Sequence, residues 1–408
     1  MTDLDAAWVR YADRIKAAGE GITGPDFPTD PRLRAEGYRY VSRLVNLAHQ
    51  IYLEFGSTTR PSLFRYNDDI STFGAPNTDN NYCRAMVDPA GTYGVTGDIS
   101  GLKELIVSVH DGEMALGKVA ILAEVTLGDL DFGDDGWLEL IVGGQERETN
   151  WIPLREESAY LNIRQFVADW ENDPIATLHI ERLDDTGPVG DVTPEFIAAA
   201  LDRAATWVET SVAFWNQFSG ALKSFTPTNE FSAPRYAEGG AVNMVHGGTR
   251  WELDENQALV VEFDQPEATY WSIQTYIFHW LAPLDFRNRV TSLNDTQVHV
   301  DDDGKVRVVI SHQDPGVQNW LDASGLAEGL CSYRWVRATT QPTPVSRRSL
   351  PPPTSASTCR RRHPSSRPPS ASSRSLLGSG VSIGVSGARV RDLDEAIRRG
   401  RRRARRQS

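Results

Sequence analysis

The sequence predicts an α+β fold that is mostly β, with two related jelly-roll or β-sandwich modules, an N-terminal helical segment and a long inter-module helix. Three observations support this class. Apolar residues recur at helical spacing within the first 56 residues and again after residue 193. Short alternating runs, separated by Gly, Asp and Asn, fill residues 60–185 and 241–336. The two β-rich stretches also repeat one ordered set of residues.

Residues 1–58 form the predicted N-terminal helical segment. Asp30 is a suitable helix cap and Pro31 suits the first helical position, so a helix is expected to begin there. Gly56 is expected to end it. One apolar stripe follows the cap at helical spacing: Tyr38, Val41, Leu44, Val45, Ala48, Ile51, Tyr52 and Phe55.

A second long helix is predicted between the two β modules. The modules are expected at residues 59–190 and 234–340, with the helix and a linker at residues 191–233. Thr193-Pro194-Glu195 is a typical helix start. Its apolar face comprises Ile197, Leu201, Ala204, Val208, Val212, Trp215, Phe218 and Leu222.

The two β modules share an Asp-Asp-Gly turn, an alternating apolar run, an Asn-Trp pair and a later Arg. The first copy has Asp135, Gly136, Asn150, Trp151 and Arg164, and the second has Asp303, Gly304, Asn319, Trp320 and Arg334. From Gly to Asn there are 14 residues in the first copy and 15 in the second. From Trp to Arg there are 13 and 14. Ordered matches at near-equal spacing predict a duplicated β module.

These repeated residues are interpreted as structural. An Asp-Gly turn between apolar runs suits a tight hairpin. The calcium alternative fails because Ile310 would occupy the twelfth position of the loop, where calcium needs a glutamate. Each Asn is expected to cap a turn and each Trp to fill the sandwich core. Arg164 and Arg334 are expected to pair with acidic residues.

The second module resembles a bacterial family of unknown function. Tyr270-Trp-Ser-Ile-Gln274, Asp314-Pro-Gly-Val-Gln-Asn-Trp-Leu-Asp322 and Arg334-Trp335 are similar to domain-of-unknown-function family 1214, over roughly residues 240–337. Pro76-Asn-Thr-Asp-Asn-Asn-Tyr82 with Val87-Asp88 more loosely resembles its frequent partner, family 1254. The resemblance implies jelly-roll domains with added helices. It implies no reaction and no catalytic residue.

Features found only in the second copy mark the predicted ligand site. Arg, Asn, His and Trp at the mouth of a jelly roll would suit a small polar or anionic ligand. The predicted site comprises Arg287, Arg289, Asn294, His312 and Trp280 of the second copy, together with the repeated Arg334. In the alternative interpretation these arginines neutralise nearby acidic residues. The alternative function is a non-catalytic assembly protein that uses its β modules to form a homo-oligomer.

The sequence supports no metal, no cofactor and no assignable reaction, so whether the protein is an enzyme stays open. His246, His279, His299 and His312 contain no His-x-His pair. A Gly-x-Ser-x-Gly pattern at residues 380–384 has no following His for a triad. No glycine-rich phosphate loop follows a predicted strand and opens a helix.

The charge of the chain is divided between an acidic body and a basic tail. Residues 1–340 contain 26 basic and 52 acidic residues, a formal charge of −26, which disfavours nucleic acid as a partner of the body. Residues 341–408 contain 16 Arg, 14 Ser, 8 Pro and no aromatic residue. This composition predicts a disordered tail, or a segment translated out of frame after about residue 345.

Other features favour a cytoplasmic protein that does not enter the membrane. No apolar run of about 18 residues is present, and the first ten residues do not form a signal peptide. The three cysteines, Cys83, Cys331 and Cys359, are odd in number and widely separated. Such spacing argues against a disulfide framework and for a reducing compartment.

Overall fold

The N-terminal segment contains two helices, and the second begins at a side-chain cap and carries an apolar stripe. The computed structural model describes residues 3–184, 192–236, 240–241 and 243–349, and all of them belong to one unit, Met1–Arg367. Helices α1 (Asp3–Gly21) and α2 (Pro31–His49) come first, and α2 continues into a π-helical turn, η1 (Gln50–Glu54). The Asp30 carboxylate accepts hydrogen bonds from the N–H groups of Arg32 and Leu33 at 3.0 and 2.9 Å, as expected for the cap. Tyr38 was predicted in the buried stripe but is 48% exposed.

The first β module consists of two sheets that share a core. One sheet has the order β1 (Phe64–Asn67), β2 (Asn80–Met86), β8 (Tyr160–Phe166), β4 (Glu104–His110) and β5 (Ile121–Thr126). The other has the order β7 (Trp151–Ile152), β6 (Trp137–Gly143), β3 (Thr92–Asp98) and β9 (His179–Arg182). Two 3₁₀ turns, η2 (Met114–Leu116) and η3 (Leu127–Asp129), flank β5. Alternate apolar residues of both sheets, such as Val95, Val107 and Leu140, are fully buried between them.

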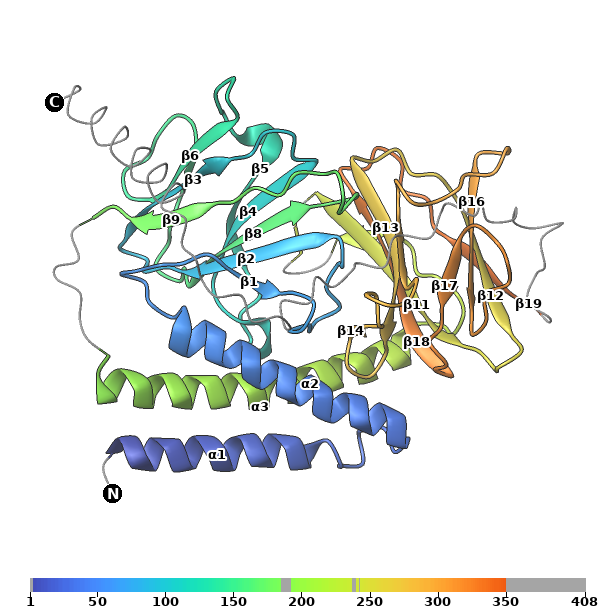
Figure 1. Ribbon diagram of the computed structural model, residues 1–408, viewed down its shortest axis with the longest axis horizontal. Helices are drawn as coiled ribbons and strands as arrows, with labels where there is room; N and C mark the ends of the chain where they lie inside the picture. Colours follow the sequence, from blue (N-terminus) through green and yellow to red (C-terminus); the bar gives the residue numbers. More distant parts are fainter. Residues whose placement is uncertain (1–2, 185–191, 237–239, 242, 350–408) are drawn as a thin grey trace, which may run out of the picture. The chain divides into compact units, whose positions relative to one another are not determined.

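Helix α3 (Pro194–Phe225) begins where the sequence predicts, with Thr193 accepting a hydrogen bond from the Phe196 N–H at 3.2 Å. Its 32 residues span roughly 48 Å. Helices α1 and α2 pack beside it (Figure 1). Arg14 of α1 forms an ion pair with Glu209 of α3 at 2.5 Å, which fixes the pairing of the two helices.

The second β module also consists of two sheets. The first has the order β10 (Arg235–Tyr236), β11 (Met244–Glu252), β18 (Glu328–Val336), β13 (Tyr270–Ile277) and β14 (Ala282–Pro283), and β15 (Ser292–Asn294) also pairs with β13. The second has the order β17 (Trp320–Asp322), β16 (Lys305–Ser311), β12 (Ala258–Asp264) and β19 (Val345–Ser349). The core between them is rich in aromatic residues, including Trp271, Tyr333 and Trp335. The fold is therefore mostly β, with N-terminal helices and a long helix between two β-rich parts, as predicted.

Strand β19 corrects the predicted start of the tail. Residues 341–349 were expected to be disordered, but Val345–Ser349 pairs antiparallel with β12. Without β19, the edge of β12 would present unpaired backbone N–H and C=O groups. Such groups can pair with a strand of almost any side-chain composition. Residues 350–408, which carry most of the predicted disorder and the reading-frame hypothesis, lie outside the described residues.

The repeated turns have the same local geometry in both modules. Gly136 and Gly304 adopt φ of 74° and 80°, where glycine is favoured. Asp135 accepts a hydrogen bond from the following Trp137 N–H at 3.2 Å, and Asp303 accepts one from the Lys305 N–H at the same distance. In the second module this turn closes a hairpin, because Val300 and Val306 pair across it.

The repeated Asn-Trp pairs lead into a short parallel strand in each module. Asn150 accepts a hydrogen bond from the Asp131 N–H, and Asn319 accepts one from the His299 N–H, each at 2.8 Å. The indoles of Trp151 and Trp320 donate to the carbonyls of Gly143 and Ser311 at 2.9 and 3.3 Å. Both tryptophans are only half-buried, although Trp320 packs against the buried cluster of Ala258, Val260, Val309 and Val317. The next residues, Ile152 and Leu321, are fully buried instead.

Candidate ligand-binding cavity

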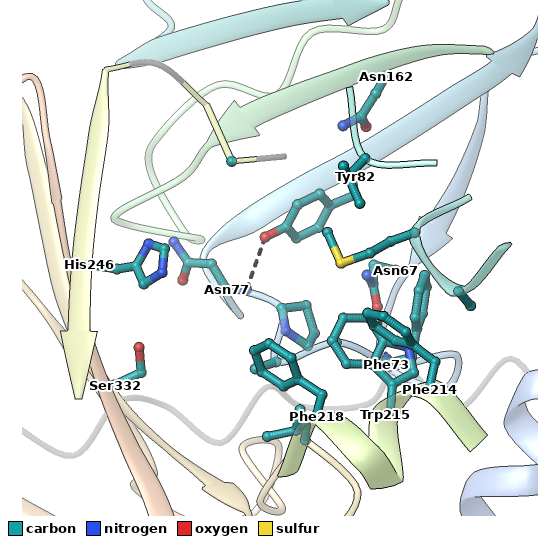
Figure 2. Close-up of a pocket in the computed structure, with 18 of the residues that line it drawn as sticks. Asn67, Phe73, Asn77, Tyr82, Asn162, Phe214, Trp215, Phe218, His246 and Ser332 are labelled. Atoms are coloured by element: carbon teal, nitrogen blue, oxygen red, sulfur yellow. Dashed lines mark hydrogen bonds between the residues drawn. The ribbon is translucent and has the colours of Figure 1, made fainter. Parts of the chain in front are cut away.

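A cavity of about 700 Å³ lies where the first sheet of each module meets the C-terminal half of α3. Three groups of elements contribute to its wall. The first module contributes β1, β2, β4, β8 and the loop after β4; the second contributes β10, β11 and β18; α3 contributes one face. Figure 2 shows the aromatic side chains of α3 on one side of the cavity and His246 and Ser332 on the strands opposite.

The polar wall of the cavity follows from strand alternation in the first module. In β8, Leu161 and Ile163 point into the core between the two sheets, so Asn162 and Arg164 point to the other face. Tyr82 of β2 pairs in register with Arg164, and His110 of β4 pairs with Tyr160, so these side chains line the same face. The sheet is covered on both sides, which explains why β4 is buried along its whole length.

The apolar wall is one face of α3. Trp207, Ser211, Trp215, Phe218 and Leu222 follow one another at helical spacing and all line the cavity. Phe214 of α3 and Phe73 of the loop after β1 extend this wall. Phe73 is in edge contact with Trp207, with 5.5 Å between the ring centroids. Trp207 and Ser211 are fully buried, whereas Phe218 is 41% exposed at the end of the wall. The cavity therefore combines one aromatic wall with one polar wall.

The loop with the Pro-Asn-x-Asp motif connects the two modules at the cavity. The Asn77 N–H donates to the Tyr82 hydroxyl at 2.9 Å, the bond drawn in Figure 2. The Asn77 side chain donates to the Tyr270 hydroxyl at 3.0 Å, and the Tyr276 hydroxyl donates to the Pro76 carbonyl at 2.9 Å. The motif that resembles family 1254 thus lies against strand β13 of the second module.

Asp79 of this loop is a buried carboxylate that the second module holds. It accepts hydrogen bonds from the Tyr270 hydroxyl at 2.8 Å and from the Asn294 side chain at 2.9 Å. Burial raises the pKa of Asp79, and the two hydrogen bonds partly oppose this effect because they favour the charged form. Asn294 also donates to the Ala168 carbonyl at 2.8 Å, so its amide holds the interface between the modules.

The charge of the cavity is opposite to that of the body. The basic side chains that line it are Arg84, Lys118, Arg164, Arg235 and Arg334, and Glu113 is the one acidic side chain among its described lining residues. Arg84 and Glu113 form a buried ion pair at 2.7 Å, and the Arg84 guanidinium lies 3.9 Å from the centre of the Tyr160 ring. The remaining basic residues give the cavity an excess of positive charge.

Arg164 is the guanidinium that this arrangement leaves without a partner. Within the described part of the chain it forms no ion pair, and its Nε is buried without a hydrogen bond. The expectation that it pairs with an acidic residue is therefore wrong. The positive charge of Arg164 nevertheless affects its neighbours. Burial is the largest cause that lowers the pKa of His110, and the charge of Arg164 is the second largest.

Arg334 lines the cavity from the second module but is bound to the protein. It donates to the Tyr276 hydroxyl at 2.8 Å and to the Ala75 carbonyl at 2.5 Å. The sequence predicts an acidic partner for it instead. Burial, with the nearby charges of Arg334 and Arg235, lowers the pKa of His246 to about 4. His246 is therefore neutral at pH 7 and can donate one hydrogen bond and accept another.

His110 is also neutral, since burial and then Arg164 and Arg84 lower its pKa to about 3. Its ring stacks on Tyr160 with 4.8 Å between centroids, and Nε2 lies 3.0 Å from the Ser108 hydroxyl. Five further buried polar atoms of lining side chains have no hydrogen-bond partner among the described residues: Asn80 Oδ1, Arg84 Nε, Trp207 Nε1, Ser211 Oγ and Trp215 Nε1. Buried polar groups are normally paired, so these atoms favour a bound molecule or water in the cavity.

Of the six predicted ligand residues, the structure brings only Arg334 to this cavity. Asn294 holds Asp79, as described above. Trp280 is buried against Gly37 of α2, and its indole donates to the Leu33 carbonyl at 3.0 Å. Most of the predicted residues therefore do not line this cavity.

The other three predicted residues also have different surroundings. Arg289 forms an ion pair with Asp322 at 2.8 Å, in line with the alternative of charge neutralisation. His312 Nε2 lies 3.3 Å from the Leu253 carbonyl, and Arg287 is exposed. The residues that do line the cavity come largely from the first module and α3. The sequence signal for this cavity is the equivalent position of Arg164 and Arg334 in the repeat, which is interpreted above as a structural feature.

Two further observations bear on the class of protein. Among the described residues, no helix is long and apolar enough to cross a membrane. Within the same part of the chain, no three His, Cys, Asp or Glu side chains gather as a metal site would require. The fold and the cavity thus define a mostly β protein with an electropositive, partly aromatic cavity between its two β-rich parts.

Known proteins support this fold and assign it no activity. Residues 243–332 match the family model described as "Protein of unknown function (DUF1214)", which confirms the resemblance in the second module. The resemblance to family 1254 stays a prediction. No functionally curated protein matches the chain.

Two solved structures are similar to this chain. The crystal structure of an uncharacterized protein from Burkholderia cenocepacia has a TM-score of 0.80 and 29% sequence identity, and the alignment covers 84% of this chain and 96% of that one. The VPA0106 protein from Vibrio parahaemolyticus has a TM-score of 0.43 and 12% identity, with 76% and 98% coverage. The first of these confirms the fold over most of the chain.

Proposed function

We propose that the protein binds a small organic anion in the cavity between its β modules. The observation that carries the proposal is the charge of the lining, in which five basic side chains face one acidic side chain. The body as a whole has a formal charge of −26. A cleft whose charge opposes that of the surrounding body concentrates ions of one sign, here anions.

The size and lining of the cavity agree with this function. A volume of about 700 Å³ lies within the usual range of small-molecule sites, roughly 300–1,000 Å³. Such sites combine apolar walls with a few polar groups that orient the ligand. The aromatic face of α3 and the polar face of β2, β4 and β8 supply the two kinds of surface.

A comparison of anions with matched neutral molecules tests the proposal. Organic carboxylates are expected to raise the melting temperature of the protein, while their primary amides are not, because a ligand that binds the folded state stabilises it by mass action. The shift should decrease as salt is added. If anions and amides shift the melting temperature equally, or if neither does, the proposal fails. A protein that binds no anion and elutes as an oligomer would favour the assembly function instead.

Two alanine positions show whether binding occurs in this cavity. Ala115 lines the cavity and is half-buried, so Ala115→Trp is expected to obstruct it and abolish the shift. Ala90 is exposed in a turn outside the cavity, so Ala90→Trp is the matched control and should leave the shift unchanged. Loss of the shift in both variants, or in neither, would contradict the location.

We also propose that the two modules are duplicated jelly-roll-like units. Support comes from the equivalent strand orders β2-β8-β4 and β11-β18-β13, and from the parallel pairs β6 with β7 and β16 with β17. In this scheme Arg164 and Arg334 occupy equivalent central strands on opposite sides of one cavity. A cytoplasmic location is in keeping with the free thiols of Cys83 and Cys331.

A further inference from the structure

We infer that the ligand is an aryl monocarboxylate, with its carboxylate on the Arg164 guanidinium and its ring on the aromatic face of α3. The inference rests on the proposed function and names the ligand class of the same cavity. It depends on which charges of the lining are unpaired and on what faces them.

Arg164 is the best-suited anion anchor because the other arginines are committed or peripheral. Glu113 neutralises Arg84 at 2.7 Å. Arg334 already donates to a carbonyl and to a phenol hydroxyl. Arg235 is exposed. Arg164 is half-buried, lines the cavity and has no ion-pair partner among the described residues, so its planar fork is free for a carboxylate.

The neighbourhood of Arg164 favours a single negative charge. His110 and His246 are neutral near pH 7, because burial and the nearby arginines lower their pKa values to about 3 and about 4. Of the other basic side chains of the lining, Glu113 neutralises Arg84, Arg334 donates to a phenol and a carbonyl, and Lys118 and Arg235 are exposed. A second carboxylate would therefore find no free buried cation beside Arg164. A dianion such as a phosphate ester is less well matched than a monoanion.

The opposite wall determines the nature of the ligand body. Phe214, Trp215 and Phe218 lie together on α3, and Trp215 is in edge contact with both phenylalanines at 4.9 and 5.7 Å between ring centroids (Figure 2). Flat aromatic surfaces of this kind bind planar apolar rings by stacking and edge contacts. A short aliphatic acid would leave this wall without a partner.

Calorimetric titration of the full chain tests the assignment. The aromatic probes are benzoate, 3-phenylpropionate and 1-naphthoate, and the non-aromatic probes are citrate, succinate and inorganic phosphate. Aryl carboxylates are expected to bind more tightly than any non-aromatic probe. Arg164→Gln should raise their Kd by roughly 10- to 100-fold, the range for losing a hydrogen bond to a charged group.

Three variants separate the anchor from a structural role. Arg164→Lys keeps the charge but loses the planar fork, so it should weaken binding less than Arg164→Gln. Arg287→Gln changes an exposed arginine outside the cavity and should bind like the wild type. Phe218→Ala shortens the exposed end of the wall and should weaken 1-naphthoate several-fold, while leaving benzoate closer to wild type.

The unliganded stability of Arg164→Gln provides a second readout. No described acidic residue pairs with Arg164, and Arg84 lies on the adjacent strand two residues from its register partner Tyr82, so the variant should unfold at the wild-type temperature or above it. A structural arginine would instead lower that temperature when removed. Wild-type affinity of Arg164→Gln for aryl carboxylates would overturn the inference. Preferential binding of citrate or phosphate would overturn it too but leave the proposed function intact, whereas binding of no anion would remove both.

Discussion

The buried ion pair of Arg84 and Glu113 gives the most direct test of how the cavity wall is held. Glu113→Gln removes the negative charge while keeping an oxygen that can accept a hydrogen bond. The Arg84 side chain is 1% exposed and that of Glu113 is 11% exposed, so water cannot replace the lost partner. Removing one partner of a buried pair costs about 3–5 kcal/mol.

The lower end of that range is expected here. The retained amide oxygen still accepts a bond from Arg84, and the guanidinium keeps its position 3.9 Å from the centre of the Tyr160 ring. We therefore expect Glu113→Gln to lower the free energy of unfolding by about 3 kcal/mol, measured by urea denaturation followed by circular dichroism. Removing both charges in Arg84→Met with Glu113→Gln should recover part of this loss.

A surface pair provides the matched control. Arg39 and Glu36 lie 3.4 Å apart with side chains that are 50% and 26% exposed. Glu36→Gln should change the free energy of unfolding by less than about 1 kcal/mol, since exposed ion pairs contribute little. If Glu113→Gln costs no more than Glu36→Gln, the buried pair does not hold the wall and the reasoning is refuted.

Three further predictions concern packing, pH and the link between the modules. A Cβ on Gly37 would lie 2.5 Å from the Trp280 ring, so Gly37→Ala should lower the free energy of unfolding by about 1–3 kcal/mol. Gly19→Ala, with open space around its Cβ, should have no cost or a gain of up to about 1 kcal/mol; equal effects in urea denaturation would contradict the packing. The pKa of His110 is lowered to about 3, so the unfolded state binds the extra proton and stability falls as the pH drops from 6.5 towards 3. His110→Phe, which keeps a ring on Tyr160, should therefore lose about 2 kcal/mol less than the wild type between pH 7 and pH 5, and an unchanged slope would show that His110 is protonated in the fold. Asn294→Ala removes a donor from the buried Asp79 and should cost about 1–3 kcal/mol without changing the Kd for a bound anion; a raised Kd at full stability would restore Asn294 as a ligand residue.

The sequence predicted the elements well wherever the deciding interactions are local. The start of α2 depends on Asp30 and Pro31, and the start of α3 depends on Thr193, all within one turn of the helix they cap. The turns at Gly136 and Gly304 are likewise local, because each requires a positive φ that the glycine itself adopts. Strand β19 was not predicted, because backbone hydrogen bonds to β12 hold it in place and its own side chains show no strand pattern.

The predicted site and the observed cavity share only Arg334, for a related reason. Arg287 and His312 attracted attention as features of one module, yet the cavity is formed by both modules and α3. Asn294 was chosen for its polar character, but its hydrogen bond to Asp79 joins residues 215 positions apart. No spacing rule relates such distant positions. The same limit applies to Arg164, because whether a described acidic residue pairs with it depends on the fold around it.

The sequence by itself determined the local structure of this protein: the helix starts, the alternation of the strands, the repeated turns and the acidic charge of the body. These depend on neighbours along the chain. Only the tertiary structure decided that Arg164, Arg334 and the aromatic face of α3 line one cavity, and that Glu113 neutralises Arg84 while no described residue pairs with Arg164. Charge pairing and burial depend on which surfaces meet, and those surfaces belong to elements that are far apart in the sequence.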